Sequence, residues 1–80
     1  MEERVAIIAI LVADKESVTT INELLHEYSE YIIGRMGLPY RAKKINIISI
    51  VLDAPQDKVS ALAGKIGKLP GVTAQTLFSK

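Results

Sequence analysis

The sequence contains no cysteine and no tryptophan, and only four of its 80 residues are aromatic. Without cysteine, neither a disulfide nor a thiolate metal site can reinforce the fold, and a reducing compartment is expected. A domain of this size buries only about 60% of the surface that its unfolded chain would expose. Because 49% of the residues are nonetheless apolar, we expect one thin core built from aliphatic and small side chains.

The chain also lacks a charge surplus and a long hydrophobic run. Ten basic side chains are balanced by nine acidic ones, for a net charge of +1, so no field of the whole domain favours nucleic acid or an acidic substrate. The apolar run Val5–Ala13 is too short to cross a bilayer, and the acidic start MEER is atypical of a signal peptide. We therefore expect a cytoplasmic protein that does not associate with membranes.

The first half of the chain predicts a strand, a helix and a second strand. Val5–Ala13 is rich in β-branched residues and has no polar position, a pattern typical of a strand covered on both faces. Asp14 can cap a following helix, which is predicted over Lys15–Ser29 from an apolar stripe that recurs every three or four residues. Tyr31–Tyr40, YIIGRMGLPY, then predicts a strand made irregular by its glycines, and Pro39–Lys44 predicts a polar connection.

The second half repeats this order, with strands over Ile45–Leu52 and Val72–Phe78. Asp53 can cap the helix between them. Because Gly64 and Gly67 each cost this helix roughly 1 kcal/mol against alanine, either they permit close packing or the helix ends early. The run LPGV then stops the helix and turns the chain into the last strand.

The two halves also match position by position. Val5–Val12 aligns with Ile45–Leu52, with the small residues Ala9 and Ser49 at the same place. A strand, helix and strand written twice at this length predicts the ferredoxin-like βαββαβ fold, an α+β sandwich in which two helices cover one face of a four-stranded antiparallel sheet. We expect residues 1–80 to form a single domain of this kind.

This fold leaves one face of the sheet without a cover. The strand Val5–Ala13 carries aliphatic side chains on both faces, whereas the helices cover only one. Leaving on the order of 400 Å² of apolar surface in water would forgo roughly 10 kcal/mol, comparable with the whole stability of a domain. We therefore expect a homo-oligomer, a dimer or a dimer of dimers, built through the open face or the sheet edges.

The sequence offers no catalytic or cofactor-binding motif. No nucleophile and base have a supporting motif, and no glycine-rich phosphate loop follows the first strand. His26 lies among glutamates at helical spacing, but the chain lacks the second histidine or the cysteine that tight transition-metal sites usually have. We expect no enzymatic activity, no resident cofactor and no metal, with His26 on the surface of a solvated helix.

A basic cluster of Arg41, Lys43 and Lys44 precedes the third strand. A contact with phosphate or nucleic acid is one interpretation. Charges on a hairpin connection more often keep a neighbouring hydrophobic strand soluble, and that interpretation explains the cluster better.

The stretch Tyr31–Tyr40 is the least generic part of the chain, and within it Gly34–Tyr40 is the predicted functional surface, at a subunit interface. Arg35 is isolated among apolar neighbours, so it either pairs with a carboxylate across an interface or presents its guanidinium to an anionic ligand. The glycines weaken the strand, which suggests that a close contact compensates. The predicted ligand-binding residues in this stretch are Gly34, Arg35, Met36, Gly37 and Tyr40.

Four segments carry a resemblance to a known family: RVAIIAILVAD, INELLHEYSEYIIGRMGLPY, INIISIVLDA and ALAGKIGKLPGV. Through them the chain resembles, over essentially its whole length, small bacterial proteins described as iron-only hydrogenase system regulators. YIIGRMGLPY is the specific part of this resemblance. That family is similar to ACT-type regulatory domains and to the effector half of nickel-responsive repressors, which assemble through their sheets and bind small molecules or metal at subunit interfaces.

The resemblance implies an ACT-like regulatory module, and two departures limit what it implies. No ribbon-helix-helix segment precedes the first strand, so we expect no DNA-reading element of that kind. The cysteine and the multiple histidines of a nickel site are missing as well. In ACT-like relatives the turn after the first strand lines ligand sites, and by this analogy Asp14 joins the predicted ligand-binding residues.

These observations favour a stand-alone, homo-oligomeric regulatory module that senses a small ligand or a partner, in the regulation of an iron-only hydrogenase system. A structural or adaptor oligomer that binds a protein partner is the alternative. A metal sensor or an enzyme fits less well, because the sequence displays neither a metal triad nor a nucleophile with its base.

Overall fold

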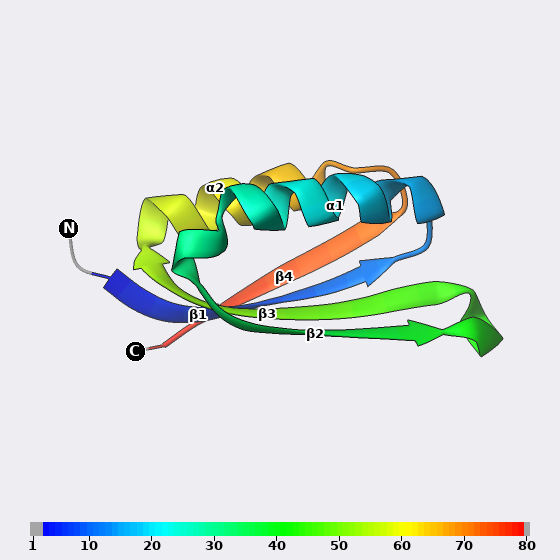
Figure 1. The fold of residues 1–80 in the computed structure, drawn as a ribbon, viewed down its shortest axis with the longest axis horizontal. Coiled ribbons are helices and arrows are strands. Elements are labelled where there is room, and N and C mark those ends of the chain that lie inside the picture. Colours follow the sequence, from blue (N-terminus) through cyan, green and yellow to red (C-terminus); the bar gives the residue numbers. More distant parts are fainter. Residues whose placement is uncertain (1–2, 80) are drawn as a thin grey trace.

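Strands and helices follow one another in the order β1, α1, β2, β3, α2, β4 in the computed structural model, which describes residues 3–79 (Figure 1). The strands are β1 (Glu3–Val12), β2 (Ile32–Tyr40), β3 (Ile45–Pro55) and β4 (Val72–Phe78). The helices are α1 (Lys15–Glu27) and α2 (Gln56–Gly67), and two 3₁₀ turns, η1 (Ser29–Tyr31) and η2 (Arg41–Lys43), flank β2. Within this part of the chain, neither helix has the length and apolar character needed to cross a membrane.

The four strands form one antiparallel sheet in the order β2, β3, β1, β4. Both helices pack on the same face of this sheet, and no other element of residues 3–79 covers the opposite face (Figure 1). We call that opposite surface the open face. The predicted βαββαβ fold is confirmed, with β1 and β3 at the centre and β2 and β4 at the edges.

Strand alternation divides the aliphatic residues of β1 between the two faces. The side chains that point to the helices are at most 1% exposed: Ala6, Ile8, Ile10 and Val12. Val5, Ile7 and Leu11, which lie between them, are 42%, 39% and 46% exposed. The two-sided apolar pattern of this strand therefore buries one side and leaves the other in contact with water.

The core is aliphatic, as the composition predicts. Helix α1 contributes Ile21 and Leu25, and α2 contributes Val59, Leu62 and Ile66, all of which are buried. These residues recur at steps of three or four, so one stripe of each helix faces the sheet. Burying each such side chain stabilises the fold by about 1.5–3 kcal/mol, which makes these stripes the main reason that the helices pack where they do.

One junction ties the start of α1 to the turn before β4. Asp14 caps α1, as predicted, by accepting a hydrogen bond of 3.0 Å from the backbone N–H two residues further on. The buried Ser17 hydroxyl donates to the carbonyl of Pro70 at 2.7 Å, and the N–H of Ala13 donates to the carbonyl of Gly71 at 2.7 Å. Gly71 has a φ of 68°, and a Cβ added there would lie 3.0 Å from the Cβ of Asp14. Any side chain at this position would therefore be strained, which favours glycine in this turn.

One predicted helix cap is wrong, and one predicted helix end differs by two residues. Asp53 does not cap α2, because β3 continues to Pro55 and Asp53 pairs with Val5 of β1. Pro55 occupies the N-cap position of α2 and makes no side-chain capping bond. Helix α1 ends at Glu27 rather than at Ser29, where the chain tightens into η1.

The predicted polar connection Pro39–Lys44 begins too early along the chain. Pro39 and Tyr40 still belong to β2 and pair with Asn46 and Ile45 of β3. Proline is tolerated there because β2 is an edge strand. On the outer side of an edge strand, the backbone forms no hydrogen bonds with a neighbouring strand.

Neither explanation offered for Gly64 applies. Helix α2 continues past it to Gly67, and no atom lies within 4 Å of a Cβ added at either glycine. Both positions are exposed, so close packing within the chain does not account for these residues.

Candidate functional site

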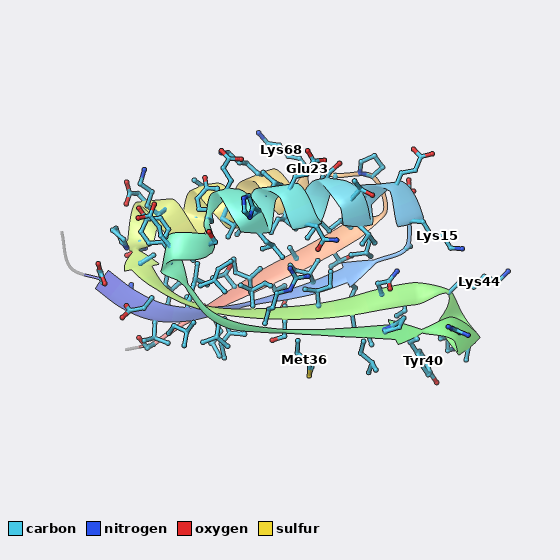
Figure 2. All side chains as sticks on the ribbon, in the orientation of Figure 1. Lys15, Glu23, Met36, Tyr40, Lys44 and Lys68 are labelled. Atoms are coloured by element: carbon cyan, nitrogen blue, oxygen red, sulfur yellow. The ribbon has the colours of Figure 1, made fainter. Side chains whose placement is uncertain are left out.

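Strand alternation splits the predicted site Gly34–Tyr40 between the two faces of the sheet. In the pairing of β2 with β3, Met36 lies opposite Ser49 and Tyr40 opposite Ile45, both on the open face. Figure 2 shows Met36 and Tyr40 pointing away from the helices. Register assigns Gly34, Met36 and Tyr40 to the open face, and Arg35 and Gly37 to the helix side. The stretch thus contributes to two different surfaces.

The open face carries a broad apolar patch. Of the eight large apolar side chains that are exposed in the described part of the chain, seven lie on this face: Val5, Ile7, Leu11, Met36, Leu38, Tyr40 and Leu77. The partly buried Ile47 and Val51 of β3 lie between the contributions of β1 and β2. Extended apolar patches of this kind on small domains usually mark an interaction surface.

Arg35 connects the edge strand to α1. Its Nη2 donates a hydrogen bond of 2.9 Å to Oδ1 of Asn22, and both residues line a hollow of about 380 Å³ between α1 and β2, together with His26. The sequence led us to expect a carboxylate or an anionic ligand as the acceptor. The acceptor within the chain is a neutral amide, so this contact orients the guanidinium without neutralising its charge.

Gly34 and Gly37 meet no close neighbour within the chain. No atom lies within 4 Å of a Cβ added at either position. The pairing of β2 with β3 shifts between Ile32 and Gly34, so the irregularity predicted for this strand is present. Any close contact that compensates for these two glycines must therefore be made with another molecule.

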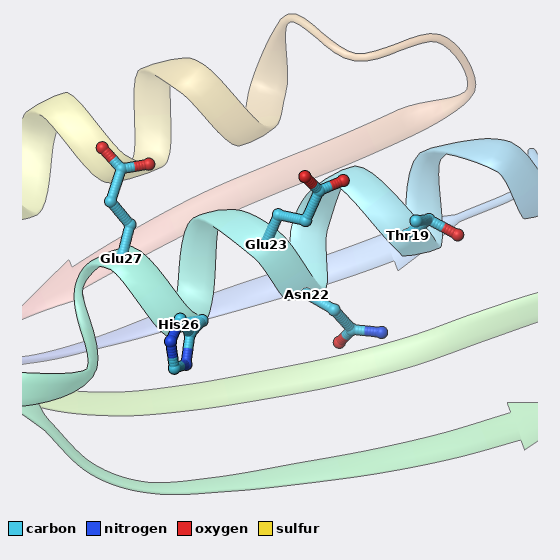
Figure 3. A pocket seen from close by; sticks show the side chains of 5 residues that line it. All are labelled: Thr19, Asn22, Glu23, His26 and Glu27. Carbon is cyan, nitrogen blue, oxygen red and sulfur yellow. The ribbon is translucent and has the colours of Figure 1, made fainter.

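His26 lies on an exposed hollow of α1 of about 610 Å³ (Figure 3). The hollow is lined by Thr19, Asn22, Glu23, His26 and Glu27. In Figure 3, His26 and Asn22 point toward the side of β2, whereas the two glutamates point the other way. No group of three or more His, Cys, Asp or Glu side chains is placed to hold a metal ion in residues 3–79. The imidazole therefore has no adjacent set of ligands from this part of the chain.

A larger hollow, of about 670 Å³, lies between the start of α1 and the hairpin that joins β2 to β3. We call it the hairpin cleft, and it is lined by Ala13, Lys15, Pro39, Tyr40, Arg41, Lys44, Ile45 and Asn46. Its charged side chains are all basic. The sequence revealed Arg41 and Lys44 as a cluster but gave no reason to add Lys15, which is 26 positions before Arg41 and reaches the cleft only through the fold.

Two of the predicted ligand-binding residues lie at this end of the molecule. Tyr40 lines the hairpin cleft, and Asp14 is flanked by the lining residues Ala13 and Lys15. The Oδ1 atom of Asp14 is already bonded to a backbone N–H as the helix cap. The structure therefore does not gather all six predicted residues around one cavity.

Lys65 interacts with an aromatic ring in the helix layer. The Nζ of Lys65 donates a hydrogen bond of 3.0 Å to the hydroxyl of Tyr28 and lies 5.1 Å from the centre of its ring. The hydrogen bond and the electrostatic attraction to Tyr28 raise the pKa of Lys65 above its ordinary value of 10.5. This contact links α2 to the end of α1 and is separate from the clefts described above.

Comparison with known proteins assigns the chain to a family. The TM1266-like family, described as "Iron-only hydrogenase system regulator, putative", matches residues 4–76. The solved structure of the uncharacterized protein TM1266 from Thermotoga maritima is 39% identical and has a TM-score of 0.94. That similarity covers 99% of this chain and 100% of the other.

Two further solved structures share the fold at lower identity. The ACT domain from the GTP pyrophosphokinase of Chlorobium tepidum has a TM-score of 0.80 at 22% identity, with 94% of this chain and 99% of that chain covered. The C-terminal domain of the MgtC protein from Mycobacterium tuberculosis has a TM-score of 0.76 at 11% identity, with 95% and 87% covered. No curated protein sequence matches the chain. At these identities the likeness establishes an ACT-like fold and carries no function with it.

Proposed function

The chain belongs to the TM1266-like family, and from that premise we propose that it is a regulatory module that assembles with copies of itself and responds to a small ligand. The family description is regulatory rather than catalytic, and the iron-only hydrogenase system that it names is the process in which we propose that this chain acts. The fold is that of an ACT domain, and in this proposal the domain works alone rather than as part of an enzyme.

The apolar open face is the observation that carries the proposal. A stable interface buries about 800 Å² on each partner, which is roughly 15% of the 5370 Å² surface of this chain. A sheet face with contributions from all four strands supplies an area of that order. Because a second copy brings an equally apolar face, packing two open faces together removes both from water.

The side-chain hydrogen bonds of the described residues include no nucleophile paired with a base. Among the side-chain hydrogen bonds within residues 3–79, none joins a serine or threonine hydroxyl to a histidine or carboxylate base. Nucleophilic catalysis needs such a pair within hydrogen-bonding reach. We therefore propose that the chain signals through binding and assembly.

Native mass spectrometry of the purified protein tests this proposal, because it reports the mass of the assembly and any retained molecule together. We expect a complex of two or four chains that carries a small molecule in a fixed ratio. A complex that retains no molecule and instead copurifies with one protein in a fixed ratio would favour the adaptor function. A folded monomer would contradict the proposal.

A further inference from the structure

The hairpin cleft gathers positive charge from two separate elements, the start of α1 and the turn of the hairpin. Lys15 is the first residue of α1, Arg41 begins η2, and Lys44 follows η2. Figure 2 shows Lys15 and Lys44 at the same end of the molecule, above and beside the hairpin. The arrangement brings together cations that are far apart in the sequence, and they share one concave surface.

The turn of the hairpin keeps two of these cations close to each other. The N–H of Lys44 donates a hydrogen bond of 3.1 Å to the carbonyl of Arg41, closing one 3₁₀ turn. This bond fixes the separation of the two backbones across the turn. Lys44 has a φ of 56°, the left-handed conformation in which the turn ends, and both side chains line the cleft.

The three cations of the cleft have no hydrogen-bonded partner among the side chains of the described residues. None of the side-chain hydrogen bonds of residues 3–79 involves Lys15, Arg41 or Lys44. The nearest acidic residues in sequence are Asp14 and Glu16, neither of which lines the cleft. Asp14 caps α1 through Oδ1 and makes no hydrogen bond with these cations.

Lys43 provides an internal contrast. It belongs to the same basic cluster and is exposed, yet it does not line the cleft. A role limited to solubility would require only that the cations be exposed, as all four are. It would give no reason for three of them to border one cavity whose volume, about 670 Å³, falls in the range of small-molecule sites.

We propose that the hairpin cleft binds a small molecule through a phosphate group. A phosphate monoester carries a charge of about −1.5 to −2 at neutral pH, which matches a cluster of three cations better than a single carboxylate does. Arginine and lysine supply the fork and the point charge that phosphate recognition uses, and Asn46 adds an amide at the wall of the cleft. Phosphate compounds are then the ligand class of the regulatory module proposed above, and the regulatory role of their binding rests on that proposal.

Amide chemical shifts of the full chain, followed during titration at constant ionic strength, test this inference. The probes are inorganic phosphate, adenosine monophosphate and, as a monovalent carboxylate, acetate. We expect phosphate and the nucleotide to shift the amide signals of the cleft-lining residues. Acetate should bind about tenfold more weakly. Lys15→Gln and Arg41→Gln should each lower the affinity for phosphate and for adenosine monophosphate about tenfold.

Lys43→Gln is the matched control, because it removes an equal charge beside the cleft, and it should change the affinity by less than about twofold. If all three variants lowered the phosphate affinity equally, or if the amide shifts were spread over the whole surface, phosphate would be attracted only by the general charge of the chain. Either result would overturn the inference. Tighter binding of a short single-stranded RNA than of the nucleotide would replace it with a nucleic-acid surface. The molar mass of the same samples keeps the two proposals apart: an oligomer without phosphate binding contradicts only this inference, and a monomer that binds phosphate contradicts only the assembly.

Discussion

Ala9 of β1 lies directly opposite Ser49 of β3, and the two form the lowest part of the open face between larger neighbours such as Ile7 and Leu11. These residues also occupy the same place in the two halves of the internal repeat. An antiparallel pair made of equivalent residues lies on the approximate twofold axis that relates the halves. The backbone of the sheet is therefore nearly symmetric about this point, which places Ala9 and Ser49 at the centre of the open face.

A charge at this centre should separate the subunits without unfolding them. Ala9→Arg introduces a long cation at an exposed position of the open face, so we expect the free energy of unfolding of the subunit to change by less than about 1 kcal/mol. Across a symmetric interface the change would bury two like charges, which is strongly unfavourable. We predict a fall to the monomer mass by light scattering.

Ser60→Arg is the control for this change, because it adds the same side chain at an exposed position of α2 on the other side of the molecule. It should leave the mass unchanged. Dissociation by Ser60→Arg, or an oligomer that survives Ala9→Arg, would exclude the open face as the interface.

The two glycines of β2 offer a matched pair for the same question. A Cβ at Gly34 or at Gly37 would have no neighbour within 4 Å in the chain, so a valine at either position should preserve the fold. Gly34 lies on the open face and Gly37 on the helix side. We expect Gly34→Val to weaken assembly and Gly37→Val to leave it intact, as measured by sedimentation equilibrium. If Gly37→Val weakened assembly and Gly34→Val did not, the interface would lie on the helix side of the edge strand instead.

Removal of the guanidinium of Arg35 should have a small effect on stability. Arg35→Ala deletes one exposed hydrogen bond to Asn22, and such a bond contributes about 0.5–1.5 kcal/mol. Asn22→Ala should lower the free energy of unfolding by a similar amount. The double variant should lower it by less than the sum of the two single changes, as measured by chemical denaturation. We also expect Arg35→Ala to bind phosphate as the unaltered chain does. If Arg35 were instead the charged anchor of the ligand, as its isolation in the sequence suggested, its loss would weaken phosphate binding as strongly as Arg41→Gln.

Gly71 is the glycine whose replacement should damage the fold itself. Its φ of 68° is unfavourable for residues with a Cβ, and that atom would lie 3.0 Å from both the Cβ and the backbone nitrogen of Asp14. We expect Gly71→Ala to lower the free energy of unfolding by about 1–2 kcal/mol or more. Gly37→Ala, at an open position, should change it by less than about 1 kcal/mol in the same denaturation experiment.

The contact between Lys65 and Tyr28 predicts a defined dependence of stability on pH. A pKa raised above 10.5 in the folded state means that protonated Lys65 stabilises the fold. This contribution is fully present below the unfolded value and is lost as the pH rises through the folded value. The difference in Tm between the unaltered chain and Tyr28→Phe should therefore be constant from about pH 6 to pH 9 and shrink above about pH 10.5. A difference that grows at high pH would contradict this.

The sequence was sufficient to predict the fold because the repeated aliphatic strands and the helical stripes are signals that span many residues. Asp53 shows where such reasoning failed: a capping residue was recognised by its type, but β3 pairs with β1 for two residues beyond it, and pairing is not a local property. The same limit applied to the candidate site. Arg35 bonds to Asn22, and Lys15 borders the same cleft as Arg41. Both arrangements depend on how α1 lies over the hairpin, which no spacing in the sequence encodes.

The molar mass of the unaltered chain in solution tests the central claim, that the open face is covered by a second copy. Light scattering at micromolar concentration should give two or four times the 8.8 kDa of one chain, with circular dichroism of the same sample confirming a folded protein. A folded chain of 8.8 kDa would mean that the open face stays in water, and the proposed assembly would be wrong.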